Sequence, residues 1–119
     1  MKIAVTSTGT DLDSPVDPRF GRAAFILVVD SDTSDYEILD NNENVNALKG
    51  AGIQAASMIS KNKAEILLTG FCGPNAFKAL NAAKIGVANN ATGSVREAIA
   101  DFLDGKMPLA DEANVEGHW

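Results

Sequence analysis

Apolar residues along the chain fall into two kinds of pattern, short runs and longer stretches with helical spacing. The short runs predict five strands, over residues 2–6, 24–30, 36–40, 65–69 and 85–88. The run over residues 24–30 is almost entirely apolar, which is typical of a strand that is buried on both faces. We therefore expect this strand to lie near the centre of a sheet.

Three stretches with helical spacing follow the third, fourth and fifth runs. They predict helices over residues 46–61, 74–83 and 95–104. Pro74 suits a first helical position, because its missing N–H would be unpaired there anyway. Ser94 and Glu97 match a capping box, and Gly105 marks the end of the last helix.

The predicted order of elements is β-β-β-α-β-α-β-α, which matches folds of the ribonuclease H-like type. We expect one α/β domain over residues 1–105, a five-stranded mixed sheet flanked by helices, and a mobile acidic C-terminal tail over residues 106–119. Right-handed crossovers place the first strand beside the fourth, so the carboxyl ends of strands one, four and five share one edge. The polar loop over residues 7–22 lies over this edge, where ligands of open α/β sheets bind.

Two glycine-bearing turns connect strands to helices at this edge, over residues 69–75 and 89–94. Each turn precedes a helical stretch, so unpaired backbone N–H groups and the positive ends of two helix dipoles point outward. Such donors suit a compact anion. The candidate binding residues in the two turns are Gly70, Cys72, Gly73, Asn75, Asn90, Thr92 and Gly93.

The polar loop carries two arginines in its last part, within residues 17–22. Arg19 and Arg22 both offer planar groups of donors for an anion, and Phe20 between them would supply an apolar wall. An alternative stays open, in which the arginines pair with nearby aspartates and Phe20 is buried in the core. The first interpretation adds Arg19, Phe20 and Arg22 to the candidate site.

Charge is distributed unevenly along the chain. The net charge is −6, which argues against general nucleic-acid binding. Residues 44–96 contain both glycine turns and carry six bases and one acid, so this segment is positive in an acidic protein. The sequence shows neither a signal-peptide pattern nor an apolar run of membrane length, and we expect a cytoplasmic protein without a membrane partner.

Residues that usually hold metals or perform hydrolysis are scarce. Cys72 is the one cysteine, and His118 is the one histidine and the penultimate residue. These counts exclude an intrachain disulfide and a metal site made of several cysteines and histidines. The first predicted strand has no carboxylate and the fourth has Glu65 alone, so the carboxylates of a metal-dependent nuclease are missing. We expect a binding protein and not an enzyme.

Cys72 itself allows two interpretations. At a strand-to-helix turn the helix dipole can lower the pKa of a thiol, which suits a nucleophile or a ligand of a soft metal. A small apolar packing role is the alternative, and we favour it because neither a second cysteine nor a histidine lies nearby in the sequence.

Several pieces of the sequence are informative through their order and spacing. They cover residues 1–5, 17–23, 64–70, 73–77 and 92–95. Together they resemble the dinitrogenase iron–molybdenum cofactor biosynthesis family, over residue 1 to about residue 105. The resemblance implies a ribonuclease H-like fold that carries or hands on metal–sulfur clusters without hydrolytic activity.

Within that family, a short stand-alone chain is most similar to the orange proteins of anaerobes. This similarity implies a molybdenum–copper sulfide cluster that is held non-covalently, with an iron–molybdenum cofactor or its precursor as the alternative. It also implies partner proteins that deliver or receive the cluster. A function of a different class stays open, a regulatory sensor that binds a small organic anion or a nucleotide at the same edge.

Overall fold

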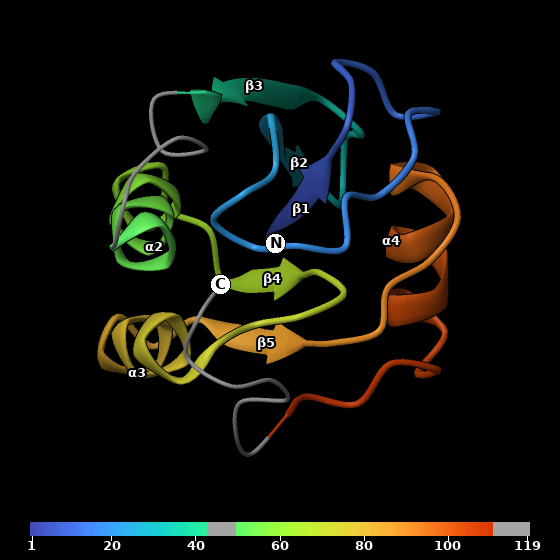
Figure 1. Ribbon diagram of the computed structural model, residues 1–119. Helices are drawn as coiled ribbons and strands as arrows, with labels where there is room; N and C mark the ends of the chain where they lie inside the picture. Colours follow the sequence, from blue (N-terminus) through green and yellow to red (C-terminus); the bar gives the residue numbers. More distant parts are fainter. Residues whose placement is uncertain (43–49, 111–119) are drawn as a thin grey trace.

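The computed structural model describes residues 1–42 and 50–110. The strands are β1 (Lys2–Ser7), β2 (Phe25–Asp30), β3 (Tyr36–Asp40), β4 (Ile66–Leu68) and β5 (Gly86–Ala88). Three helices lie entirely within the described residues, α2 (Ala51–Lys61), α3 (Pro74–Ala82) and α4 (Val95–Leu103) (Figure 1). The predicted order of strands and helices is confirmed.

The strands form one sheet in the order β3-β2-β1-β4-β5. β2 lies antiparallel to β1 and to β3, whereas β4 lies parallel to β1 and to β5, so the predicted mixed sheet is confirmed. The carboxyl ends of the three parallel strands therefore share one edge, as the crossover rule requires. We call this edge the carboxyl edge.

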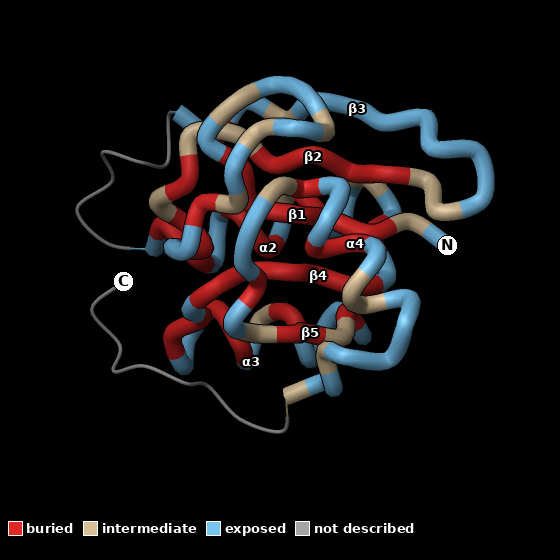
Figure 2. Tube along the Cα trace, turned by 90° about the vertical axis from the view of Figure 1, so that its right-hand side faces the viewer, coloured by how far each residue is buried: buried red, intermediate tan, exposed pale blue. Residues whose placement is uncertain are grey.

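Helices cover both faces of the sheet, with α2 and α3 on one face and α4 on the other (Figure 1). The alternation along β1 shows this division, since Ala4 packs in the cluster with α2 and α3 while Ile3 and Val5 pack in the cluster with α4. Figure 2 shows β1, β2 and β4 in the buried colour and β3 as exposed.

Helix α2 begins later than the sequence pattern predicts. Gly50 precedes it with φ of 80°, a left-handed conformation that glycine adopts without strain, and the helix starts at Ala51. The predicted first turn, over residues 46–49, lies outside the described residues. The other helices begin at their predicted residues, Pro74 and Val95.

The chain returns to the sheet after α4. The N–H of Ala110 donates to the carbonyl oxygen of Val87 in β5 at 2.7 Å, and Ala110 packs against the core. A Cβ atom added to Gly86 would lie 3.1 Å from Leu109. Leu109 and Ala110, which belong to the segment that we expected to be a mobile tail, therefore lie beside β5, because its outer side offers hydrogen-bonding groups. Residues 111–119 lie outside the described residues.

Candidate functional site

The loop between β1 and β2 crosses the carboxyl edge and is tied to the strands beneath it. The N–H of Asp17 donates to the carbonyl oxygen of Thr6 at 3.0 Å. The N–H of Phe71 donates to the carbonyl of Pro18 at 2.6 Å, and the N–H of Phe20 donates to the carbonyl of Phe71 at 3.2 Å. These bonds pair the loop with the β4–α3 turn as if it were a short extra strand.

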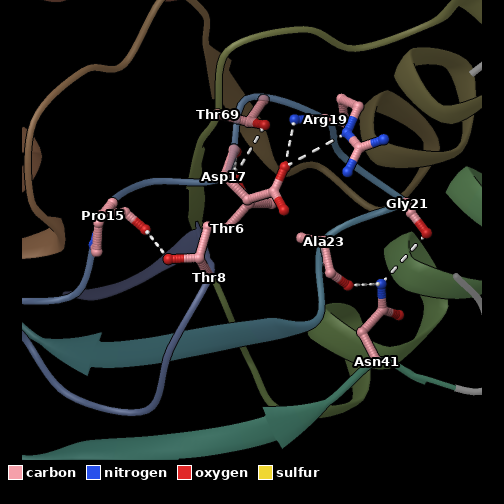
Figure 3. Close-up of polar contacts among 9 residues, drawn as sticks. All are labelled: Thr6, Thr8, Pro15, Asp17, Arg19, Gly21, Ala23, Asn41 and Thr69. Carbon is pink, nitrogen blue, oxygen red and sulfur yellow. Dashed lines mark hydrogen bonds and ion pairs between the residues drawn. The ribbon is translucent and has the colours of Figure 1, made fainter.

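Buried polar side chains hold the loop in place (Figure 3). The hydroxyl of Thr6 donates to the carbonyl oxygen of Asp17 at 2.6 Å and lies 3.0 Å from the hydroxyl of Thr69. At the other end of the loop, the side-chain amide of Asn41 donates to the carbonyls of Gly21 and Ala23. Thr6, Thr69 and Asn41 are fully buried, so they fix the loop as part of the scaffold.

Arg19 extends from this fixed loop at the point where it meets Phe71. Its Nε lies 3.7 Å from Oδ1 of Asp17, and its backbone N–H donates to the same oxygen at 3.0 Å. The side chain of Asp17 is 9% exposed and that of Arg19 is 48% exposed. Within the described residues the terminal NH₂ groups of Arg19 make no hydrogen bond, so they remain available to a ligand.

Arg22, the second predicted arginine, is only partly exposed. It already takes part in an interaction of its own within the protein. The alternative drawn from the sequence is therefore correct in part, since Arg19 does pair with a nearby aspartate and keeps donors in reserve.

The aromatic wall of the site is a different residue from the one that the sequence indicated. Phe20 is 1% exposed and packs in the core, so the alternative that buries it is correct. Phe71 is 36% exposed, and it sits beside Arg19 in the β4–α3 turn. The sequence of the turn gave no local signal for this exchange, since the neighbouring Cys72 is fully buried.

The thiol of Cys72 faces the core. Cys72 is fully buried, packs in the cluster with α2 and α3, and its Sγ lies 3.7 Å from the carbonyl oxygen of Gly73. Burial raises the pKa of Cys72 to about 12, so the thiol is protonated at neutral pH. The geometry agrees with the packing role that we favoured, and the backbone of Cys72 remains part of the turn.

The N-terminus of α3 keeps donors free. Gly73 is the N-cap residue, Pro74 opens the helix, and among the described residues no side chain caps this end. The first turn carries no acidic residue. The N–H groups of Asn75 and Ala76 have no acceptor in the described part of the chain, and Asn75 is exposed. Ala76 is 6% exposed, so this helix end presents the exposed residue Asn75 and a positive dipole to solvent.

The N-terminus of α4 is already satisfied by the protein, contrary to the expectation that both helix ends are open. Ser94 and Glu97 form the predicted capping box, in which each side chain accepts the backbone N–H of the other at 3.1 and 3.0 Å. The N–H of Val95 and of Arg96 donate to loop carbonyls, at 3.0 and 2.8 Å. The reason is the loop itself, which lies against this helix end and fills it.

Thr92 and Gly93 lie on an open hollow of about 560 Å³ next to this helix end. Two carboxylates, those of Asp13 and Glu97, line the same hollow. The Nε of Arg96 is paired with Oδ1 of Asp13 at 3.1 Å. Carboxylates so close make the hollow a poor site for an anion.

Gly70 and Asn90 join the two turns. The N–H of Asn90 donates to the carbonyl oxygen of Gly70 at 3.1 Å. A Cβ on Gly70 would lie 2.7 Å from backbone atoms of Pro18, so glycine is required for the loop to approach. The structure thus joins Gly70 to Asn90 and pairs Phe71 with Arg19, whereas Thr92 and Gly93 line the hollow that contains the carboxylates.

The described part of the chain contains no group of three or more histidine, cysteine, aspartate or glutamate side chains placed to hold a metal ion. None of the helices in that part is long and apolar enough to span a bilayer. Within the described residues, the carboxyl edge therefore offers backbone and guanidinium donors and no such group of metal-binding side chains.

Comparison with known proteins identifies relatives of this chain. A model of the family described as dinitrogenase iron-molybdenum cofactor matches residues 1–105. The apo form of the orange protein from Desulfovibrio gigas is 48% identical, with a TM-score of 0.94 over 96% of both chains. A putative NifB protein from Thermotoga is 30% identical, with a TM-score of 0.84 over 98% of both chains. An uncharacterized protein of Methanocaldococcus jannaschii is 29% identical over 90% of this chain and 89% of its own length.

Proposed function

Because the chain belongs to the dinitrogenase iron-molybdenum cofactor family, we propose that it binds and carries an anionic metal–sulfur cluster at the carboxyl edge. The family and the similarity to the orange protein indicate a role related to metal clusters or cofactors. In this proposal the protein acts as a carrier and not as an enzyme, and it exchanges the cluster with proteins that deliver or receive it.

One observation carries the proposal, the uncapped N-terminus of α3, whose N-cap Gly73 follows two residues after Phe71, the residue that pairs with Arg19. A metal–sulfide cluster is bulky, negative and already saturated with sulfide ligands. It needs N–H donors, a guanidinium group and an apolar wall more than it needs side chains that coordinate metal. Asn75, Ala76, Arg19 and Phe71 supply those groups from fixed positions.

The proposed site refines the one drawn from the sequence. It keeps Arg19, Arg22, Asn75 and Asn90 at the rim, with the backbone of Gly70, Cys72 and Gly73 as its floor. Phe71 replaces Phe20 as the aromatic wall, and the site leaves out Thr92 and Gly93. Phe20 is left out because it is buried. Thr92 and Gly93 are left out because they share a hollow with two carboxylates, which repel an anion.

A molybdenum–copper sulfide cluster is the cargo that we propose, because the chain is 48% identical to the orange protein of Desulfovibrio gigas. An iron–molybdenum cofactor or its precursor, which the family description names, is the alternative cargo. Both are sulfide-rich anions, so the donor set above suits either of them.

Anaerobic reconstitution tests the proposal. Metal-free protein is mixed with tetrathiomolybdate and copper(I), passed over a desalting column, and assayed for visible absorbance, molybdenum, copper and sulfide. Arg19→Ala is compared with Arg96→Ala, since both arginines are exposed and each is paired with one aspartate. Loss of a hydrogen bond to a charged group is typically worth about 1.5–3 kcal/mol, so Arg19→Ala should weaken retention by roughly tenfold or more.

We expect Arg96→Ala to retain colour like the unmodified protein. Equal retention in both variants would place the cluster away from Arg19 and refute the proposed site. A protein that stays colourless under these conditions, but binds an organic anion or a nucleotide, would favour the regulatory sensor in place of the carrier.

A further inference from the structure

Strand β3 is an edge strand, and no other strand of the described residues pairs with its outer side. The N–H of Asp30 donates to the carbonyl of Asp35, and the N–H of Asn41 donates to the carbonyl of Ala24, at 2.8 and 2.9 Å. In an antiparallel pair, every second residue directs its backbone N–H and C=O groups toward the same neighbouring strand. The odd-numbered residues of β3, which lie between these two bonds, therefore direct their backbone groups toward β2. The N–H and C=O groups that point away from the sheet belong to Tyr36, Ile38 and Asp40.

The side chains of β3 are also uncovered on one face. Tyr36 and Ile38 are 37% and 48% exposed. They lie opposite Val29 and Leu27, which belong to the face that α4 covers. α4 packs over β1, which lies two strands away from β3 in the sheet, so α4 does not cover β3 (Figure 1). Two apolar side chains at alternate positions thus accompany the open backbone groups.

Charge decides which partner suits this edge. Residues 30–40 contain five acids and no base. Two copies of residues 30–40 would bring ten carboxylates near a self-paired edge, which disfavours a second copy of this chain. A strand that carries lysine or arginine between apolar residues complements the negative charge of this edge and also contacts its exposed apolar side chains.

We propose that β3 is a docking edge for an extended basic segment of a partner protein, which adds to the sheet as a further strand. The backbone groups of Tyr36, Ile38 and Asp40 supply the hydrogen bonds, and the exposed faces of Tyr36 and Ile38 supply the apolar contact. The acids around them select for basic side chains.

The position of β3 connects this docking edge with the loop at the carboxyl edge. Asn41 follows β3 directly, and its side chain donates to the carbonyls of Gly21 and Ala23 at 3.2 and 2.8 Å (Figure 3). A partner strand that runs along β3 therefore ends next to Asn41, the residue that holds this end of the loop. A role in delivering or receiving the cluster rests on the proposed function, but the docking itself does not.

A short acetylated peptide that alternates lysine and valine is the probe. It is titrated into isotope-labelled protein without any cluster, and amide chemical shifts report where it binds. Two control peptides have proline at the centre or glutamate in place of lysine. We expect saturable shifts centred on residues 35–41 with the first peptide and none with either control, since proline interrupts the strand and glutamate is repelled.

Variants of β3 separate strand addition from a general attraction between charges. Ile38→Pro removes an outward N–H and leaves the pairing with β2 intact, so it should abolish binding. Ile38→Lys adds a repelling charge and should weaken binding by roughly fivefold or more. Ile53→Lys is its control, because Ile53 is 46% exposed on α2 and should change nothing. Circular dichroism checks that each variant is folded, and Ile38→Lys decides the matter if Ile38→Pro unfolds.

Three outcomes would overturn the proposal. Equal binding of the proline-interrupted peptide would show charge attraction without strand pairing. Shifts that leave β3 unchanged would place the peptide elsewhere. A dimer in sedimentation experiments that Ile38→Lys dissociates would assign the edge to a second copy of the chain. Because no cluster is present, failure here is distinct from failure of reconstitution.

Discussion

The β4–α3 turn and the β5–α4 turn join parallel strands to helices at the same edge, and each contains a glycine that its conformation or its neighbours require. They differ in whether the first backbone N–H groups of the following helix are hydrogen-bonded within the protein. In α4 the capping box and the loop accept all of them. In α3 the N-cap is Gly73, and the N–H groups of Asn75 and Ala76 find no acceptor among the described residues.

This difference teaches how a helix end becomes available to an anion. A helix dipole is present at both turns, but a ligand can use it only where the protein has not satisfied the donors itself. The acid in the first turn of α4, Glu97, also cancels positive potential, whereas α3 has no acid there. Of the two turns, we therefore treat the first as a binding site and the second as a structural joint.

Gly70→Ala should have the largest effect. Its Cβ would lie 2.7 Å from backbone atoms of Pro18, so the loop must move and Arg19 moves with it. Overpacking of this kind costs about 1–3 kcal/mol of unfolding free energy, and we expect cluster retention to be lost as well. Urea denaturation and reconstitution measure the two effects.

Gly105→Ala is the control for this substitution. Gly105 has φ of 79°, and the space around its Cα is open, so an alanine there meets backbone strain but no clash. We expect a modest loss of stability and full cluster retention. Wild-type stability in Gly70→Ala would show that the loop does not depend on this close approach.

Asn75→Asp should convert the first turn into a copy of the second. A carboxylate in the first turn of α3 stabilises the helix by about 0.3–1 kcal/mol. The same charge repels an anionic cluster, so retention should fall by at least roughly tenfold while the melting temperature rises.

Glu97→Gln is the reciprocal change at α4. It removes the acid from a first turn that we exclude from the site, so stability should fall slightly and retention should stay the same. Thermal melts and desalting assays on both variants provide the check. A stable Asn75→Asp protein that binds the cluster normally would contradict the assignment of the site to α3.

Ser94→Ala should have a smaller effect that is confined to stability. The hydroxyl of Ser94 accepts the N–H of Glu97 at 3.1 Å, and loss of such a cap costs about 0.5–2 kcal/mol. The loop carbonyls still bind the N–H groups of Val95 and Arg96, so the edge keeps its shape. Cluster retention should match the unmodified protein, and a clear loss of colour would return α4 to the site.

The fold could be predicted from sequence because its signals are local. Apolar runs mark the strands, Pro74 and the Ser94 capping box mark two helix starts, and the crossover rule orders the parallel strands. The start of α2 was missed because Gly50 lies inside an apparently continuous helical pattern and adopts a left-handed conformation.

The site was harder to predict, since it depends on contacts between distant residues. Nothing near Phe20 in the sequence tells that it fills the core, while Phe71 is held outward beside the loop. The loss of donors at α4 depends on carbonyls of the loop, far away in the sequence. A capping box was the one local sign that this helix end would be satisfied internally.

Cys72→Ala should have the smallest effect on binding, because the thiol faces the core and is protonated at neutral pH. The thiol of Cys72 instead affects the stability of the protein at alkaline pH. The pKa of the folded thiol is about 12 and the ordinary value is 9.0, so the unfolded chain releases the proton first. Between these values stability should fall by about 1.4 kcal/mol for each pH unit, and Cys72→Ala should lack this part of the decline.

The same variant completes the comparison of the two turns. If backbone donors and Arg19 hold the cluster, Cys72→Ala keeps its visible spectrum with at most a small shift after reconstitution at neutral pH. If a thiolate holds it, the colour is lost while the protein still melts cooperatively. The second result would mean that the turn opens to release Cys72 from the core, and that the first turn differs from the second by a metal ligand as well as by its free donors.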